Sequence, residues 1–488
     1  MQMRKDLSNR SLTFAARKRS PSRERQRAGL PIFCSAVLLA LLAASELSAQ
    51  SKPLPRLRVS ENGHFFVKEG GAPFFYLGDT AWCVFTRPTH EEVDRYLQDR
   101  AAKGFTAIQG VLLIWDGLTR PNPLGQMLLV DKSGANINEA FFDNVDYIVD
   151  EAESLGMYTL ILPIWSKGML GGQRSVFDET TGYNYCKLIG ARYRNKPVIW
   201  MLGGDRPGTG MEAITRALAR GLTDGGGPAT MISYHPTGRQ SSSMWFHNEP
   251  WLSFNSIQSG HSSQNKNYEL VTSDYQLKLA KPVIDSEAGY ENITDGLRQA
   301  EPGIKRLGAW DVRRYGYLSV FAGAAGFAYG NGELYEFWTP GMQQTRWMAG
   351  LPWQESMQLP GSSQMQYVRN LVESRPMLAR IPDQSLLESD PMATTDRQQA
   401  TRASDGSYAF VYSAAGRLIE IRFDSMPAKA IRAWWYDPRT GAAKEIGRFP
   451  KTAAREFKPP TSGVDNDWVL VLDDAAKKFP APGKAVTR

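Results

Sequence analysis

Cysteine is scarce in this sequence of 488 residues, which has three in all. Cys34 lies in the N-terminal leader described below, so only Cys83 and Cys186 remain. Two cysteines cannot form a disulfide framework, and the fold therefore has to rest on a hydrophobic core. We expect two buried thiols, with a single bridge between them as the alternative.

Excess positive charge is also lacking beyond the first 50 residues. Residues 1–50 hold nine of the 57 Lys and Arg and three of the 50 Asp and Glu, which leaves 48 basic and 47 acidic residues, a net charge of +1. A surface that binds nucleic acid needs a clear excess of basic residues. We therefore predict no nucleic-acid partner.

The hydrophobic run from Leu30 to Ala44 is too short to cross a bilayer comfortably. Basic residues precede it up to Arg27, and the small-residue pattern Leu47-Ser48-Ala49 follows it. This arrangement predicts a signal peptide over residues 1–49, with an uncleaved anchor as the alternative. The mature protein is then expected to be secreted or periplasmic, with no stable membrane insertion after cleavage.

Several motifs that carry chemistry are missing. No glycine-rich phosphate-binding fingerprint follows the first strand-like run, and neither H-E-x-x-H nor G-x-S-x-G occurs. The five histidines, three of which fall between residues 235 and 261, show no pair with catalytic zinc spacing. We therefore expect no cofactor, no metal and no serine nucleophile.

What the sequence does contain is an alternation of apolar runs and amphipathic stretches. Eight runs read as strands: Phe74–Leu77, Thr106–Leu113, Thr159–Ile164, Val198–Leu202, Thr230–Tyr234, Ser253–Gln258, Val283–Asp285 and Gly326–Tyr329. Short apolar strands separated by helices are typical of parallel sheets covered on both faces. We predict a (β/α)8 TIM barrel over residues 52–380, with a doubly wound open sheet as the alternative.

The helical stretches between the runs have recognisable ends. Thr89 and Glu92 have the spacing of a capping box, and Gly104 stands where that helix should end. Apolar residues recur at helical spacing between Phe142 and Leu155. Residues 182–193 and 209–222 are further candidates.

The pattern changes near residue 380. Period-two alternation appears at Tyr408–Tyr412, Ile419–Phe423, Trp434–Tyr436 and Val469–Val471, with turn signals between these runs. This spacing predicts a small antiparallel β-sandwich over residues 381–478, followed by a tail over 479–488.

In a (β/α)8 barrel the active site lies at the carboxyl ends of the strands. Polar and aromatic residues close or closely follow the predicted strands: Asp79, Gln109, Trp115, Trp165, Asp205, His235, Gln258, Glu287 and Asn331. The expected site is a ring made of these side chains.

Two carboxylates stand out in the ring. Asp205 follows the fourth predicted strand and Glu287 the seventh, so they should face each other across the barrel mouth. A glycosidase needs such a pair, one group to protonate the leaving oxygen and one to attack or to activate water. Asp285, deeper on the same strand face, competes with Glu287, and an ion pair of Asp205 with Arg206 is the structural alternative.

The remaining members of the ring are expected to bind substrate. Tryptophan faces can stack on sugar rings, and polar side chains can hydrogen-bond hydroxyl groups. The expected substrate-binding residues are Asp79, Trp82, Gln109, Trp115, Trp165, His235, Gln258 and Asn331; Trp245 also flanks a strand end.

Several segments resemble one known family. They are Tyr76–Trp82, Gly104–Gln109, Leu202–Asp205, Gln258–His261 and Pro282–Glu287. Over residues 55–380 the sequence resembles the apiosidase-like family of secreted bacterial proteins, glycoside hydrolase family 140. The C-terminal segment, with Trp435–Gly441, resembles the collagen-binding β-sandwich often attached to this family.

The resemblance implies a retaining barrel glycosidase that releases apiose-containing side chains from pectin. It implies that Asp205 is the acid/base and Glu287 the nucleophile. Two stretches, Tyr329–Glu333 and Ser286–Gly289, depart from the family pattern, and both lie where the enzyme is expected to recognise its substrate. The catalytic pair can therefore persist while the sugar differs.

These inferences predict a secreted glycoside hydrolase that acts on an oligo- or polysaccharide of the plant cell wall. Two alternatives stay open, a non-catalytic carbohydrate- or matrix-binding protein on a barrel scaffold and a glycosidase of different sugar specificity.

Overall fold

The computed structural model describes residues 53–115, 119–131, 133, 136–167, 170 and 175–484 of the chain. The predicted signal peptide at residues 1–49 lies outside the described residues. Within them, none of the helices is both long and apolar enough to span a bilayer.

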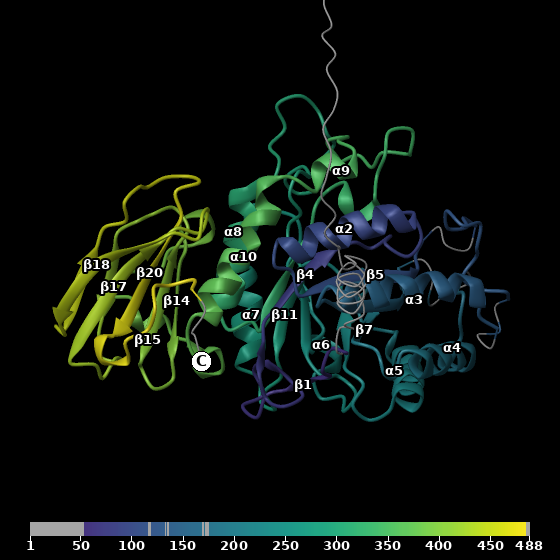
Figure 1. Ribbon diagram of the computed structural model, residues 1–488, viewed down its shortest axis with the longest axis horizontal. Coiled ribbons are helices and arrows are strands. Elements are labelled where there is room, and N and C mark those ends of the chain that lie inside the picture. The colour runs from purple at the N-terminus through teal and green to yellow at the C-terminus, as the bar shows by residue number, and fades with distance from the viewer. Residues whose placement is uncertain are drawn as a thin grey trace, which may run out of the picture. The chain divides into compact units, whose positions relative to one another are not determined.

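The core of the larger domain is a parallel barrel (Figure 1). Its strands in chain order are β4 (Tyr76–Thr80), β5 (Ala107–Leu113), β6 (Tyr158–Ile164), β7 (Val198–Gly203), β8 (Ile232–His235), β10 (Asn255–Gln258), β11 (Val283–Glu287) and β12 (Gly326–Tyr329). They match the eight predicted strands, with shifts of a few residues at their ends. The prediction of a TIM barrel is therefore confirmed.

Hydrogen-bonded pairing runs from β8 through β7, β6, β5, β4, β12 and β11 to β10, and the short β9 (Gln240–Ser241) pairs antiparallel to β10. The register of β12 on β4, with Gly326 opposite Tyr76, joins the last strand to the first. β8 and β10 are joined by separate bonds, among them Ser253 N to Ile232 O at 2.8 Å and Ser233 Oγ to Phe254 O at 2.7 Å. The ring is thus nearly closed.

Helices cover the outside of the barrel (Figure 1). They are α2 (His90–Ala102), α3 (Glu139–Ser154), α4 (Glu179–Arg192), α5 (Glu212–Gly226), α6 (Ser243–Phe246), α7 (Asn267–Tyr275), α8 (Ala309–Phe321), α9 (Trp353–Ser356) and α10 (Pro360–Glu373). Thr89 and Glu92 form the predicted capping box of α2, and Gly104 and Gly156 adopt positive φ angles just after α2 and α3. Five 3₁₀ turns lie at Leu334–Glu336, Met377–Ala379, Gln384–Leu386, Thr394–Asp396 and Ala475–Lys477.

Two small antiparallel units flank the barrel sequence. Before it, β1 (Leu57–Val59), β2 (Phe66–Lys68) and β3 (Pro73–Phe74) form a sheet that the sequence analysis did not predict. After it, one sheet has the order β13 (Arg380–Pro382), β14 (Gln398–Ala403), β15 (Tyr408–Ser413), β20 (Trp468–Asp474), β17 (Ala430–Tyr436) and β18 (Ala443–Pro450). β16 (Ile419–Arg422) and β19 (Ala454–Phe457) form a second, two-stranded sheet. The predicted C-terminal β-sandwich is confirmed.

The two cysteines of the described part, Cys83 and Cys186, are both buried thiols rather than a bridge. This agrees with the expectation that the hydrophobic core, and not a disulfide, holds the fold together.

Candidate functional site

A cleft of about 820 Å³ lies at the carboxyl ends of the barrel strands. Of the predicted ring, it is lined by Trp82, Trp115, Trp165, Asp205, Gln258 and Glu287. Both carboxylates on which the glycosidase prediction depends therefore face the same cavity. A cavity of this size falls in the range of sites that enclose a small molecule or a few sugar units.

Asp205 is placed by a tight turn at the end of β7. Gly203, Gly204 and Asp205 have φ angles of 85°, 112° and 52°, three consecutive residues in the left-handed region. Glycine is needed at Gly204 because a Cβ there would lie 2.9 Å from the Trp165 ring. Aspartate is one of the few other residues that accept this conformation, which is costly for most side chains and concentrated at functional sites.

The Asp205 carboxylate lies at the edge of the cleft, with 28% of its side chain exposed. Gln258 Nε2 donates a hydrogen bond to Oδ1 at 2.9 Å, and Lys167 Nζ lies 3.2 Å from Oδ2. Gln258, expected to contact substrate, thus lines the cleft and also orients this acid. The structural alternative of a pair with Arg206 is not what is seen, since Lys167 takes that place.

Glu287 is the last residue of β11, and its side chain is 6% exposed. Its carboxylate lies between two imidazoles, with His235 Nε2 at 2.9 Å from Oε2 and His261 Nε2 at 3.0 Å from Oε1. Burial alone would raise the pKa of Glu287, but the hydrogen bonds and charges of the two histidines outweigh it and hold the pKa well below its usual range. Glu287 is therefore a carboxylate at neutral pH.

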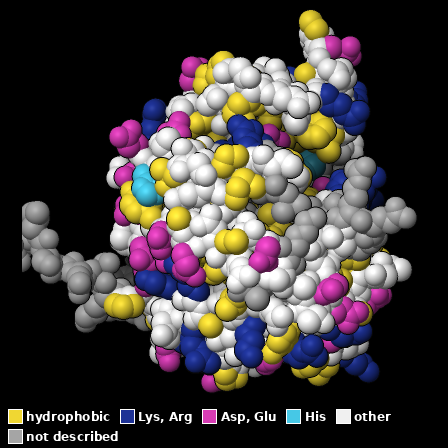
Figure 2. All heavy atoms as spheres, turned by 90° about the vertical axis from the view of Figure 1, so that its right-hand side faces the viewer, with side chains coloured by type: hydrophobic (Ala, Val, Ile, Leu, Met, Phe, Trp, Pro, Cys, Tyr) yellow, Lys and Arg dark blue, Asp and Glu magenta, His cyan; other side chains and the backbone are white. Residues whose placement is uncertain are grey.

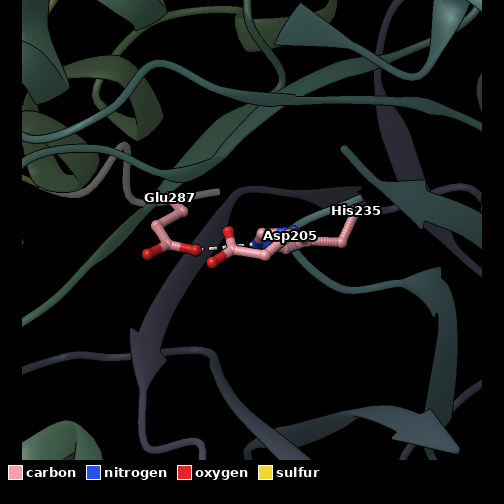
Figure 3. Close-up of side chains that lie close together, drawn as sticks. All are labelled: Asp205, His235 and Glu287. Atoms are coloured by element: carbon pink, nitrogen blue, oxygen red, sulfur yellow. Dashed lines mark ion pairs between the residues drawn. The ribbon is translucent and has the colours of Figure 1, made fainter. Parts of the chain in front are cut away.

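Asp205, His235 and Glu287 come from the ends of β7, β8 and β11 and meet in the cleft wall (Figure 3). Each offers one oxygen or nitrogen atom, and these atoms all lie within 4.8 Å of one another. Spacing alone would also fit a cation held by the three. The Glu287 carboxylate is, however, already contacted by His235 Nε2 and His261 Nε2, one on each oxygen.

The tryptophans differ in what they offer a ligand. Trp82 and Trp165 are only 2% and 5% exposed, and they pack on each other with ring centroids 5.3 Å apart. Trp82 Nε1 also donates to the Tyr290 hydroxyl at 2.9 Å. Trp115, at 41%, presents a large exposed face. Stacking on a sugar ring is therefore best supported for Trp115, whereas the other two form the wall. Trp245 does not line the cleft and donates from Nε1 to Thr209 Oγ1.

Four predicted substrate-binding residues do not line the cleft: His235, which is fully buried against Glu287, and Asp79, Gln109 and Asn331. Asp79 is fully buried beside Arg100, whose Nε lies 3.0 Å from Oδ2, and burial outweighs this partner to raise the pKa of Asp79 to about 6. Gln109 donates to Thr80 and to the Ser286 carbonyl inside the barrel. Asn331 accepts from the backbone of two following residues. Contact of these four with substrate stays a prediction that their placement does not favour.

Asp285, the competitor of Glu287, is also interior. Its Oδ2 accepts hydrogen bonds from Ser259, Asn267 and Ser319 at 2.9, 3.1 and 3.0 Å, and the residue is fully buried. Glu287, which lines the cleft, is the better-placed of the two.

The sequence analysis missed three residues of the site. Lys167, His261 and Tyr290 all line the cleft from loops that follow β6, β10 and β11. Each stands three residues beyond the end of a strand, and His261 also closes the Gln258–His261 segment that carries the family resemblance.

On the face shown in Figure 2, Lys and Arg side chains are interspersed with Asp and Glu. This mixture is what the near-neutral charge beyond the leader implies. The absence of a nucleic-acid partner remains a prediction.

Comparison with known proteins identifies the family. Residues 60–379 match the family model described as "Apiosidase-like, catalytic domain". The chain belongs to the apiosidase-like family. Residues 381–473 match a model described as "Putative collagen-binding domain of a collagenase". No curated protein matches the chain.

Solved structures agree with this assignment. A protein described as a glycoside hydrolase is 32% identical, with a TM-score of 0.81 and coverage of 87% of this chain and 98% of its own. A protein described as a glycoside hydrolase of family 5 from Bacteroides vulgatus is also 32% identical, with a TM-score of 0.81 and coverage of 87% and 94%. A further glycoside hydrolase fold from the same organism, at 15% identity and a TM-score of 0.63 over 86% and 82%, supports the fold alone. This apiosidase-like protein is a glycosidase.

Proposed function

We propose that this apiosidase-like protein is a secreted or periplasmic bacterial enzyme that cleaves a glycosidic bond in apiose-containing pectic polysaccharide by a retaining mechanism. The observation that carries the mechanism is the distance between the two acids. Retaining enzymes hold their carboxyl groups about 5–5.5 Å apart, and inverting enzymes about 6.5–9.5 Å. Asp205 and Glu287 have oxygens within 4.8 Å of each other in one cleft, which supports retention.

The surroundings of the two acids indicate which one is the nucleophile and which one is the acid/base. Glu287, kept as a carboxylate by two histidines, attacks the anomeric carbon and forms a glycosyl ester. Asp205, more exposed and on the opposite side of the gap, gives its proton to the leaving oxygen. It then takes a proton from the water that hydrolyses the ester, which restores both groups.

The substrate is supported by family membership. The Tyr329–Glu333 and Ser286–Gly289 stretches, however, depart from the family pattern. A glycosidase of different sugar specificity is therefore the second candidate. The non-catalytic alternative is disfavoured because both acids face one open cleft.

The test uses Glu287→Gln and Asp205→Asn with pectic oligosaccharides that carry apiose. Asparagine also tolerates the left-handed backbone at position 205, so that variant should fold. Each substitution should lower kcat by about 10²- to 10⁴-fold or more, and proton NMR of the wild-type reaction should show the first product with the anomeric configuration of the substrate.

Glu179→Gln, an exposed acid in the first turn of α4, is the matched control and should leave the rate unchanged. Unchanged turnover of Glu287→Gln would remove Glu287 from the mechanism. Turnover of other glycans but not of apiose-containing ones would favour the second candidate.

A further inference from the structure

His235 is fully buried, and both of its ring nitrogens face atoms that accept hydrogen bonds. Nδ1 lies 3.0 Å from the Pro236 carbonyl oxygen, and Nε2 lies 2.9 Å from Glu287 Oε2. A carbonyl oxygen can only accept, so Nδ1 must carry a proton. Nε2 makes no aligned hydrogen bond to Glu287 Oε2, but the two atoms lie 2.9 Å apart. At that distance an unprotonated Nε2 would set its lone pair against those of the ionised carboxylate, so Nε2 carries a proton as well.

His261 does not have this double requirement. Its Nε2 lies 3.0 Å from Glu287 Oε1, while its Nδ1 has no hydrogen-bond partner among the described residues. A neutral ring with its proton on Nε2 satisfies that geometry. The contacts of His261 therefore require one proton, whereas those of His235 require two.

We propose that His235 is an imidazolium at neutral pH, a positioning residue that keeps Glu287 ionised and speeds the second half of the reaction by making Glu287 a better leaving group. This inference rests on the proposed role of Glu287 as nucleophile. It assigns His235 a role different from the substrate contact predicted from sequence.

The charges around His235 support this state. Carboxylates face it from the ends of two strands, Glu287 on β11 and Asp205 after β7. The other titratable groups nearby are His261, Tyr290 and Lys167, which touch Glu287 or Asp205 rather than His235. Burial would lower the pKa of His235, but Glu287 and then Asp205 raise it above its usual value.

Water is excluded on the remaining sides. The His235 ring packs against Trp82 and Trp165, with centroids 5.5 and 5.4 Å apart. In this low-dielectric wall the pair of opposite charges interacts strongly, and neither group can easily replace its partner with water.

The charge on Glu287, and with it the effect of the imidazolium, changes between the two steps of the reaction. In the first step a Glu287 oxygen bonds to the anomeric carbon as the glycosidic bond breaks, so the carboxylate charge disappears and His235 is left buried without its counter-ion. In the second step water bonds to the anomeric carbon, Asp205 takes the water proton, and the ester bond electrons return to Glu287. The imidazolium favours this return and so lowers the barrier to hydrolysis of the ester.

The decisive experiment needs no substrate. The full chain is labelled with ¹⁵N-histidine, and two-bond ¹H–¹⁵N spectra are recorded at pH 7–8 for the wild type, H235Q and E287Q. The chain has five histidines, so the resonance lost in H235Q is identified directly. H90Q is the control, because His90 is a half-buried histidine at the start of α2 that does not line the cleft.

We expect the His235 signal of the wild type to show two protonated nitrogens at pH 7–8, and the pKa of His235 to be lower in E287Q, which lacks the carboxylate. A singly protonated His235 in the wild type would overturn the proposal. So would a change of the His235 signal on treatment with EDTA, because it would place a cation and not a proton between the side chains.

The kinetic arm uses the apiose-containing oligosaccharide of the functional test. H235Q should lower kcat by about ten-fold or more with little change in the first-turnover burst, and intact mass spectrometry should show accumulated glycosyl-enzyme. Wild-type kcat with no accumulation would overturn the catalytic part. Failure of the proposed function is distinct, since it appears as an active E287Q, whereas the ¹⁵N spectra do not depend on turnover.

Discussion

At the scale of single residues, the charge pair of His235 and Glu287 links stability to pH. The folded-state pKa of His235 is raised above its ordinary value of 6.5, so its contribution is complete below pH 6.5 and is lost as pH rises through the raised pKa. The pKa of Glu287 is lowered from 4.5, so its contribution is complete above pH 4.5 and is lost only in acid. The pair should therefore stabilise the fold most between pH 4.5 and 6.5.

This pH dependence predicts how the free energies of unfolding of the wild type and of His235→Gln differ. The difference in their free energies of unfolding should shrink by about 1 kcal/mol or more between pH 6 and pH 9, since each pH unit over which one proton is released is worth about 1.4 kcal/mol. Urea denaturation of both proteins at several pH values measures this difference. A gap that stays constant over this range would mean that His235 is neutral in the folded protein.

At the scale of secondary-structure elements, α4 and α5 pack unusually closely. A Cβ at Gly225 would lie 2.2 Å from the Lys187 carbonyl oxygen, and one at Gly221 would lie 2.4 Å from the Tyr183 carbonyl oxygen. Both obstacles are backbone atoms of α4, which a rotamer change cannot move. Glycine is therefore required here by helix packing and not by a turn.

The prediction is that Gly225→Ala destabilises the protein by about 1–3 kcal/mol, the usual cost of forcing extra atoms into a packed contact. On helix propensity alone, the same change would stabilise by about 1 kcal/mol. Ala213→Gly, at an exposed position of α5, calibrates the propensity effect and should cost no more than about 1 kcal/mol. Thermal unfolding monitored by circular dichroism gives both values, and a stabilised Gly225→Ala would show that the helices can separate freely.

The elements also show what the sequence can and cannot predict. The eight strands could be found because each is a short apolar run between helical stretches, and Asp205 and Glu287 could be paired because they follow the fourth and seventh of them. The direction of a side chain near a strand end could not be found. Asp79 stands one residue before the end of β4 and points inward to Arg100, whereas Glu287 ends β11 and reaches the cleft.

The site residues that lie in loops were harder to predict from the sequence than those at strand ends. His261 reaches Glu287 only because the loop after β10 is held by backbone bonds to a distant segment, including Gly296 N to His261 O at 2.7 Å. Such contacts depend on the completed fold, and no local sequence pattern predicts them. The same holds for the contact between His235 and Glu287, which lie at the ends of β8 and β11, two strands separated by β10.

At the scale of the whole molecule, residues 53–484 behave as one body in which the barrel and the sandwich share a core. α8 is the shared element, since all of its residues from Trp310 to Phe321 are buried. Tyr317 stacks on Tyr412 with centroids 4.8 Å apart, and Trp310 Nε1 donates to the Ala414 carbonyl at 2.9 Å. The sandwich therefore packs on the barrel through a shared core.

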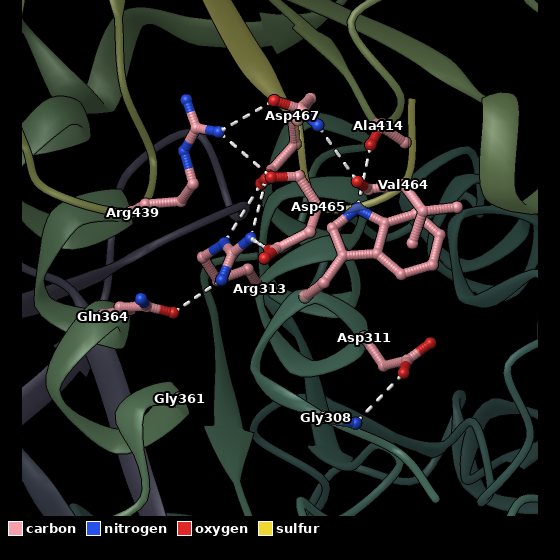
Figure 4. Close-up of polar contacts among 12 residues, drawn as sticks. Gly308, Asp311, Arg313, Gly361, Gln364, Ala414, Arg439, Val464, Asp465 and Asp467 are labelled. Carbon is pink, nitrogen blue, oxygen red and sulfur yellow. Dashed lines mark hydrogen bonds and ion pairs between the residues drawn. The ribbon is translucent and has the colours of Figure 1, made fainter. Parts of the chain in front are cut away.

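The centre of this interface is a buried ion pair. Arg313 on α8 donates to Asp467 from Nη2 at 2.8 Å and from Nε at 3.2 Å, and both side chains are almost completely buried. Nη2 also donates to Asp465, and Nη1 donates to Gln364 (Figure 4). Removing one partner of a buried pair leaves a charge without compensation, which costs about 3–5 kcal/mol. The loss should be felt by both domains because the arginine belongs to the barrel and the aspartate to the sandwich.

We therefore predict that Asp467→Asn lowers the melting temperature of the entire chain while unfolding stays a single transition. Asp465→Asn is the matched control, because Asp465 contacts the same guanidinium but is 63% exposed, and it should cost no more than about 1 kcal/mol. Differential scanning calorimetry of the three proteins provides the comparison. A separate early transition for the sandwich in Asp467→Asn, with the transition of the barrel unchanged, would contradict this prediction. It would show that the two domains unfold independently.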